Sequence, residues 1–226
     1  MTPALELSTV GLRLGSGAER LDDISLRLPA GSVGTVVGPA GSGKSLLLAI
    51  AALEQRPSRG SVRLFGREAN SGDAVMRAAA RRRIGWVEAE PILVATLDAV
   101  DNAALPLRLA GTEREEARAR ASELLAWLGE PVPLGSTLAP ELRHRVAIAR
   151  AVLAGQELIL VDEVAALPPA LAERFITLVT QLSRTGTAFL LTSRDERVLA
   201  RFPATPSWHL LGGRLQVIDS PAAERL

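Results

Sequence analysis

One glycine-rich segment narrows the possible folds of this chain more than any other part of its sequence. The segment fits the pattern G-x-x-x-x-G-K-[ST], and its residues are Gly38, Pro39, Ala40, Gly41, Ser42, Gly43, Lys44 and Ser45. A short β-branched run at residues 33–37 precedes it, and an apolar run typical of a helix follows it at residues 44–55. Because this pattern builds a phosphate-binding loop where it joins a strand to a helix, the sequence predicts such a loop here.

Each residue type in the segment has a chemical reason. Glycines let the backbone curl so that successive N–H groups converge on phosphate oxygens, and the following helix adds a favourable dipole. Lys44 is the chain's only lysine among 26 basic residues, and it can reach the β- and γ-phosphates as a compact charge. Ser45 is placed to bind Mg²⁺. A chance glycine-rich turn is the alternative, and the flanking strand and helix count against it.

Two consecutive acids follow another apolar run. Residues 158–161 read LILV and precede Asp162 and Glu163. In proteins with this loop the first acid holds Mg²⁺, directly or through water, and the second can polarise the attacking water. Asp162 could instead cap the next helix. Given the phosphate loop, we expect residues 38–45 and Asp162 to bind the nucleotide, Ser45 and Asp162 to bind the metal, and Glu163 to be catalytic.

Composition limits the other classes of protein. The chain has 226 residues, 47% of them hydrophobic, which suits one domain with its own core. Alternating strands and helices predict an α/β fold with a mainly parallel sheet, and a helical stretch at about residues 91–150 predicts an inserted subdomain. A net charge of +1 and the lack of a basic patch with aromatics predict no nucleic-acid partner. His144 and His209 are not accompanied by other residues at metal-ligand spacing, so we interpret them as structural or surface residues.

The sequence contains neither a disulfide framework nor a visible membrane signal. It has no cysteine. Its first residues lack the basic start, apolar core and cleavage site of a secretory signal. No stretch approaches the roughly 18 uncharged apolar residues that span a bilayer. We therefore expect a cytoplasmic protein whose membrane role comes through a partner.

The order of these motifs resembles that of ABC-transporter ATPases. A phosphate loop is followed by a helical insert, by RVAIARA at residues 145–151, and by the strand that ends in two acids. The resemblance covers residues 5–218. The stretches RRRIG at residues 81–85 and DNAALPLRLAG at residues 101–111 look most like the FtsE-type cell-division ATPases, and the lipoprotein-release and macrolide-export ATPases are similar here too.

The resemblance implies a P-loop NTPase fold of ABC ATPase type, with residues 1–226 as one ATP-binding domain. It implies ATP and Mg²⁺ as cofactors. It also implies a head-to-tail homodimer or heterodimer, in which ATP lies between the phosphate loop of one subunit and the signature loop of the other. An integral membrane subunit, FtsX-like in the cell-division case, would dock near residues 88–100. The protein would then be peripheral on the inner face of the cell membrane.

Several positions depart from the family's pattern. The replaced features are the adenine-stacking aromatic (Leu14), the loop glutamine (Ala89), the D-loop aspartate (Pro168), the switch histidine (Arg194) and the LSGGQ signature, which reads LAPEL at residues 138–142. Pro140 removes a backbone N–H from the signature, and Glu141 adds a negative charge that would repel phosphate. Arg194 keeps a cation where a γ-phosphate would lie.

We therefore expect a protein that binds Mg-ATP at Lys44, Ser45 and Asp162 but hydrolyses it slowly or not at all. One hypothesis is an ATPase that drives a membrane partner, with Glu163 as general base. A second is a non-hydrolysing, ATP-responsive scaffold for the same kind of partner. A third, a P-loop kinase or GTPase, is disfavoured because the guanine-reading N-K-x-D motif would need a second lysine.

Overall fold

The computed structural model describes residues 2–15, 17, 19–70, 74–133, 135, 138–202 and 206–218, apart from the side chain of Glu141. The strands are β1 (Pro3–Arg13), β2 (Glu19–Pro29), β3 (Val33–Val37), β4 (Arg59–Leu64), β5 (Arg67–Glu68), β6 (Ile84–Val87), β7 (Leu158–Val161), β8 (Ala188–Ser193), β9 (Ser207–Leu211) and β10 (Arg214–Ile218). The helices are α1 (Lys44–Ala51), α2 (Ala74–Arg81), α3 (Ala99–Leu109), α4 (Arg114–Leu128), α5 (Pro140–Leu153), the 3-10 turn η1 (Val164–Ala166), α6 (Pro169–Arg184) and α7 (Glu196–Leu199).

A mainly parallel sheet of six strands forms the centre, in the order β10-β9-β3-β8-β7-β6. Strand β3 pairs in parallel with β8 and β9, and β7 pairs in parallel with β6 and β8. Strands β3, β7 and β8 are buried along their whole length, as expected when helices cover both faces of a parallel sheet. The α/β fold that the sequence predicts is confirmed.

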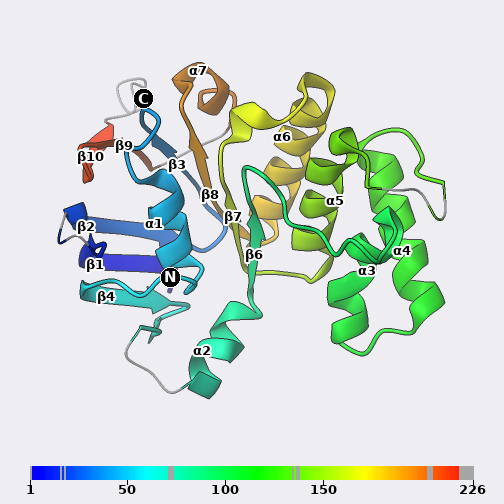
Figure 1. Ribbon diagram of the computed structural model, residues 1–226, viewed down its shortest axis with the longest axis horizontal. Coiled ribbons are helices and arrows are strands. Elements are labelled where there is room, and N and C mark those ends of the chain that lie inside the picture. The colour runs from blue at the N-terminus through cyan, green and yellow to red at the C-terminus, as the bar shows by residue number, and fades with distance from the viewer. Residues whose placement is uncertain are drawn as a thin grey trace.

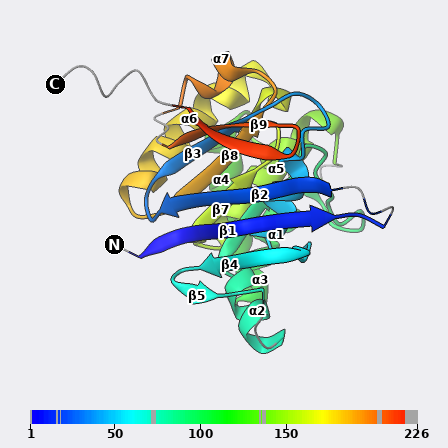
Figure 2. The same ribbon diagram turned by 90° about the vertical axis from the view of Figure 1, so that its left-hand side faces the viewer.

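A second sheet, which the sequence analysis did not separate from the first, is antiparallel and has the order β2-β1-β4-β5. Figure 2 looks onto it, with these strands one below another and α2 beneath them. Along β2 buried residues alternate with exposed ones, because one face packs on the core and the other meets water. Helix α1 lies between the two sheets (Figure 1), and its buried residues share one hydrophobic cluster with both.

Helices α3, α4 and α5 pack against one another beyond β6, at the right of Figure 1. Asp98 is the N-cap of α3, and its carboxylate accepts the Asp101 N–H at 2.7 Å, which is the bonding of a good helix N-cap. Its other oxygen accepts the Gly135 N–H at 3.0 Å. These helices lie within the predicted insertion of about residues 91–150, whose status as a separate subdomain stays a prediction. Among the described residues, no helix is long and apolar enough to cross a bilayer.

Candidate functional site

The glycine-rich loop leaves a central strand at its carboxyl end and enters α1. Its path is fixed by backbone bonds: the Gly38 N–H donates to the Ser193 carbonyl at 3.2 Å, and the Ser42 N–H donates to the Pro39 carbonyl at 3.2 Å. Gly43 precedes α1 without a side-chain cap. The first N–H groups of α1 are therefore free of a capping side chain and can bind an anion.

Two glycines in the loop are required by close approach. At Gly38, a Cβ atom would lie 2.4 Å from the Leu210 carbonyl oxygen. At Gly43, φ is 108°, in the left-handed region, and a Cβ would lie 2.7 Å from Leu21 Cδ2. A side chain at either position would push the loop away from β9 or β2. The loop therefore keeps its curvature only with these glycines.

Lys44 is buried at the first position of α1, with 6% of its surface exposed. Its Nζ donates to the Gly38 carbonyl at 2.6 Å and to the Pro39 carbonyl at 3.0 Å, so the loop wraps around the ammonium. Burial lowers the pKa of Lys44 below 10.5, and the nearby carboxylates of Glu163 and Asp162 oppose that shift. The structure thus brings the loop lysine and both sequence-predicted acids into one electrostatic cluster.

Asp162 follows β7 and is held by the neighbouring strand. Its Oδ1 accepts a bond of 2.7 Å from the Thr192 hydroxyl, and its N–H donates to the Val87 carbonyl at 2.8 Å. Only 9% of the residue is exposed. Asp162 does not act as the N-cap of η1, because the residue at that position is Glu163. A role in holding the nucleotide's metal therefore stays open to its carboxylate.

Glu163 has a strained backbone, and both oxygens of its side chain accept hydrogen bonds. Its φ and ψ are 54° and 65°, in the left-handed region that costs a non-glycine residue about 1–2 kcal/mol. Its Oε1 accepts the Arg194 N–H at 3.1 Å and the Ser193 hydroxyl at 3.3 Å. Its Oε2 accepts Arg194 Nε at 3.1 Å in an ion pair. The sequence placed the Arg194 cation against a γ-phosphate, whereas the structure places it against Glu163.

The residues present fit a phosphate group and its magnesium. The Ser42 hydroxyl is buried and has no hydrogen-bond partner among the described residues, so this donor of the loop remains available to a phosphate oxygen. Ser45 is exposed at the start of α1. No cluster of three or more metal-binding side chains occurs in the described part of the chain. Mg²⁺ needs none, because it is bound by one or two protein oxygens together with phosphates and waters.

Two site residues escaped the sequence analysis. Thr192 and Ser193 end β8, and their hydroxyls bond to Asp162 and Glu163. Their signal was a pair of hydroxyl residues at the end of an apolar strand. The partners of that pair depend on which strand lies beside β7, and no local sequence pattern identifies that neighbouring strand.

Most of the other departures from the family's pattern lie in the described part of the chain. Leu14 is 40% exposed. Pro140 is the first residue of α5, where proline suits a helix start, and Pro168 is the N-cap residue of α6. The Glu141 side chain, which we expected to repel phosphate, lies outside the described residues. His144 bonds through Nε2 to the Ala89 carbonyl at 2.9 Å, which agrees with a structural role.

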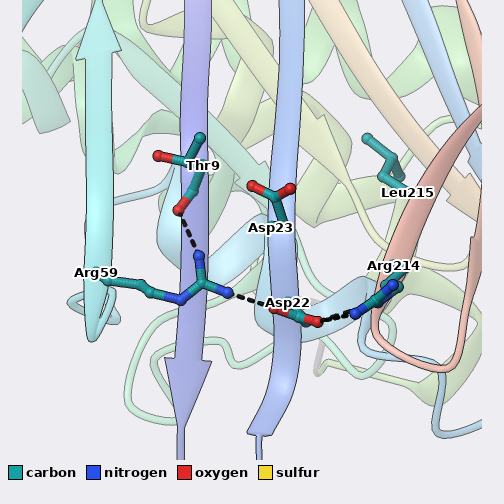
Figure 3. A pocket seen from close by; sticks show the side chains of 6 residues that line it. All are labelled: Thr9, Asp22, Asp23, Arg59, Arg214 and Leu215. Carbon is teal, nitrogen blue, oxygen red and sulfur yellow. Dashed lines mark hydrogen bonds and ion pairs between the residues drawn. The ribbon is translucent and has the colours of Figure 1, made fainter.

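A separate polar cavity of about 480 Å³ lies on the antiparallel sheet near β10 and is lined by Thr9, Asp22, Asp23, Arg59, Arg214 and Leu215. Figure 3 shows Asp22 between the two arginines. Arg214 Nε bonds to Asp22 Oδ2 at 3.0 Å, and this bond is the main reason why the pKa of Asp22 is lowered. Because Asp22 and both arginines are already paired, we interpret this network as a tie between the sheets.

Three comparisons with known proteins support one assignment. The profile of the ABC transporter family matches residues 21–166. The lipoprotein-releasing system ATP-binding protein LolD of Bordetella pertussis is 35% identical over 225 residues, which cover 95% of this chain and 96% of the relative. The macrolide export ATP-binding/permease protein MacB of Salmonella typhimurium is 35% identical over 209 residues, but the match covers only 32% of that longer protein.

Among solved structures, a dimeric post-hydrolysis state of the ATP-binding cassette MJ0796, bound to ADP and Pi, has a TM-score of 0.83 and 27% identity. The match covers 94% of this chain and 96% of that one. A second dimeric structure of the same cassette has a TM-score of 0.85. The likeness therefore extends over nearly all of the fold.

Proposed function

Since this chain belongs to the ABC transporter family, we propose that it is an ATP-binding subunit that works with an integral membrane partner. The observation that carries the proposal is Lys44, a buried ammonium wrapped by the loop carbonyls and set beside Asp162 and Glu163. A buried cation beside the uncapped N-terminus of α1 suits a polyphosphate. Ser45 and Asp162 would hold Mg²⁺, which neutralises phosphate charge when bound.

The proposed assembly is a homodimer or heterodimer docked on a permease. Support comes from the dimeric cassette structures and from LolD, a chain of the same length class that is named for a releasing system. The segment after β6 is a suitable docking surface for the permease, because Ile92 there is 73% exposed. In this proposal the protein lies on the cytoplasmic side of the membrane through that partner.

Hydrolysis at this site would be slow. In the reaction a water oxygen attacks the γ-phosphorus, the bond to the bridging oxygen breaks, and Glu163 takes the water's proton. The products are ADP and phosphate. Glu163 is instead bonded to Arg194 and Ser193, and Pro140 removes an N–H from the signature. A non-hydrolysing, ATP-responsive scaffold is the second candidate function, favoured by these same changes.

The cellular process has two candidates. RRRIG at residues 81–85 and DNAALPLRLAG at residues 101–111 favour an FtsE-type role in cell division with an FtsX-like permease. The 35% identity to LolD over almost the whole chain favours lipoprotein release, and the match to MacB favours a macrolide-export-type transporter. Purification from membranes of the native host, followed by identification of the bound permease, distinguishes these candidates. A chain recovered alone and wholly outside the membrane fraction contradicts all of them.

Calorimetry with Mg-ATP tests the nucleotide site itself. We expect saturable binding by the folded protein and a loss of at least tenfold in affinity in Lys44→Ala, because the buried cation is removed. Steady-state phosphate release then separates the two candidate functions, with Glu163→Gln as the control for base-dependent turnover. Rates of about 1 per second or faster, abolished in Glu163→Gln, would refute slow hydrolysis. Absence of ATP binding at millimolar nucleotide would refute the proposed function.

A further inference from the structure

Arg194 and Ser193 together occupy both carboxylate oxygens of the proposed base, Glu163. Oε2 accepts Arg194 Nε, and Oε1 accepts the N–H of the same residue together with the Ser193 hydroxyl. The Glu163 side chain is 11% exposed and the Arg194 side chain is 61% exposed. The carboxylate is thus held against the end of β8 by a partner that can move away into solvent.

We propose that Arg194 is a positioning residue that holds Glu163 in a resting arrangement, and that ATP hydrolysis requires this ion pair to open. The inference rests on the proposed function. It goes beyond it by assigning the slow step to one contact within this chain, rather than to the altered signature of a partner subunit.

Three features indicate that the Arg194–Glu163 ion pair can open and is not a permanent structural contact. First, Arg194 has no other ion-pair partner among the described residues, because the neighbouring Asp195 is paired with Arg197. Second, Glu163 interacts with both Arg194 and Lys44, so the two cations already share one anion. Third, a half-exposed ion pair contributes little to stability and is screened by salt. A phosphate group near Lys44 could therefore draw the guanidinium from Glu163.

The opening step also fits the backbone. Glu163 is fixed in the left-handed region by the Thr192 hydroxyl, which accepts its N–H at 3.0 Å. Withdrawal of the Arg194 guanidinium therefore frees Oε2 without moving the main chain, while Oε1 still accepts the Arg194 N–H and the Ser193 hydroxyl. The carboxylate could then accept a hydrogen bond from water, which a general base needs.

The test compares Arg194→Ala, Arg194→Lys and wild type at saturating Mg-ATP. We expect Arg194→Ala to raise kcat about fivefold, the factor that corresponds to a partly exposed ion pair, while ATP affinity from calorimetry stays within about threefold. Arg194→Lys retains a cation and should remain near the wild-type rate. The matched control is Arg197→Ala in the same loop, whose side chain is 91% exposed and pairs with Asp195; it should leave kcat unchanged.

Two further measurements separate the opening of this ion pair from general loosening of the loop. The gain in Arg194→Ala must vanish in the double variant Arg194→Ala/Glu163→Gln, because it depends on the carboxylate. Wild-type kcat should rise with salt as the pair is screened, and kcat of Arg194→Ala should not. An Arg194→Ala enzyme that binds ATP normally but is no faster than wild type, or slower, would overturn the inference alone. A wild-type protein that binds no ATP would instead overturn the proposed function.

Discussion

The Thr192 hydroxyl donates to Asp162 Oδ1 at 2.7 Å, joining the ends of the neighbouring strands β8 and β7. The same hydroxyl accepts the N–H of Glu163 at 3.0 Å. One buried side chain therefore sets the position of both consecutive acids. Thr192 itself is fully buried, so no water can replace it without rearrangement.

Replacing Thr192 with valine, which has a similar shape, should uncouple the acids. The change leaves Asp162 Oδ1 and the Glu163 N–H without their partner, at a cost of about 1–3 kcal/mol in the free energy of unfolding. Mg-dependent ATP binding should weaken as well. Urea denaturation and calorimetry measure the two effects. The control is Thr187→Val just before the same strand, where the hydroxyl bonds to the Gln156 carbonyl at 3.3 Å and to no other described residue. Equal losses in both variants would contradict a special role for Thr192.

The depressed pKa of Lys44 predicts a loss of ATP affinity on the alkaline side. Burial lowers the pKa of the folded state below 10.5, so Lys44 loses its proton at a lower pH than an exposed lysine does. Between the lowered pKa and 10.5 the unfolded chain binds more protons, so the free energy of unfolding rises with pH while phosphate binding weakens. Calorimetric titrations with ATP, from neutral pH towards 10.5, should show this decline in ATP affinity. The Lys44→Ala variant should show no such dependence.

Gly43 and Gly41 form a matched pair for testing loop curvature. Both have positive φ, 108° and 75°, so alanine at either position strains the backbone by about 1–2 kcal/mol. At Gly41 the added Cβ meets open space, whereas at Gly43 it lies 2.7 Å from the buried Leu21. We expect Gly43→Ala to lose at least tenfold more ATP affinity than Gly41→Ala. Similar losses would show that only strain, and not contact with β2, shapes the loop.

Asn102 fixes the loop that precedes α3 and leads to the proposed docking surface. It is fully buried. Its Nδ2 donates to the carbonyls of Val94, Leu97 and Asp98 at 3.0 Å each, and its Oδ1 accepts the Val94 N–H at 2.8 Å. Because Asn102→Ala removes all four hydrogen bonds, the free energy of unfolding should fall by at least about 2 kcal/mol.

The control for this variant is Asn70→Ala. Asn70 accepts the Val62 N–H at 2.8 Å and donates to the Gly60 carbonyl at 3.1 Å, in a half-buried position. Asn70→Ala should lower the free energy of unfolding by about half as much as Asn102→Ala does. Urea denaturation compares the two, and recovery of the permease in a pull-down should fall in Asn102→Ala only. An Asn102→Ala protein as stable as wild type would contradict the proposed role.

Local patterns predicted the elements of the parallel sheet well. The apolar runs at residues 33–37 and 158–161 correspond to β3 and β7, because a strand buried on both faces needs no tertiary context to be recognised. Helix α1 ends at Ala51, whereas the sequence predicts a helix up to residue 55. Leu53, which lies just beyond the observed end, has a positive φ of 61°. Strand pairing could not be predicted, because the alternation of apolar and polar residues in β2 determines which face is buried but not which strand lies beside it.

The same limit applies to the site. The sequence brought Lys44, Asp162 and Glu163 into one hypothesis through their pattern and order, and the structure places them together. It gave no indication that Arg194 would face Glu163, since that contact depends on the register of β7 against β8. Residues that belong to a recognisable motif could be predicted from the sequence. Contacts with residues of a neighbouring strand could not.

The left-handed backbone of Glu163 has a consequence for anyone who engineers this protein. Glycine or asparagine at position 163 would relieve the strain of a φ of 54° and make the chain more robust to heat. A laboratory selection for thermal robustness alone would therefore discard the carboxylate early. Its retention would mean that turnover was being selected as well.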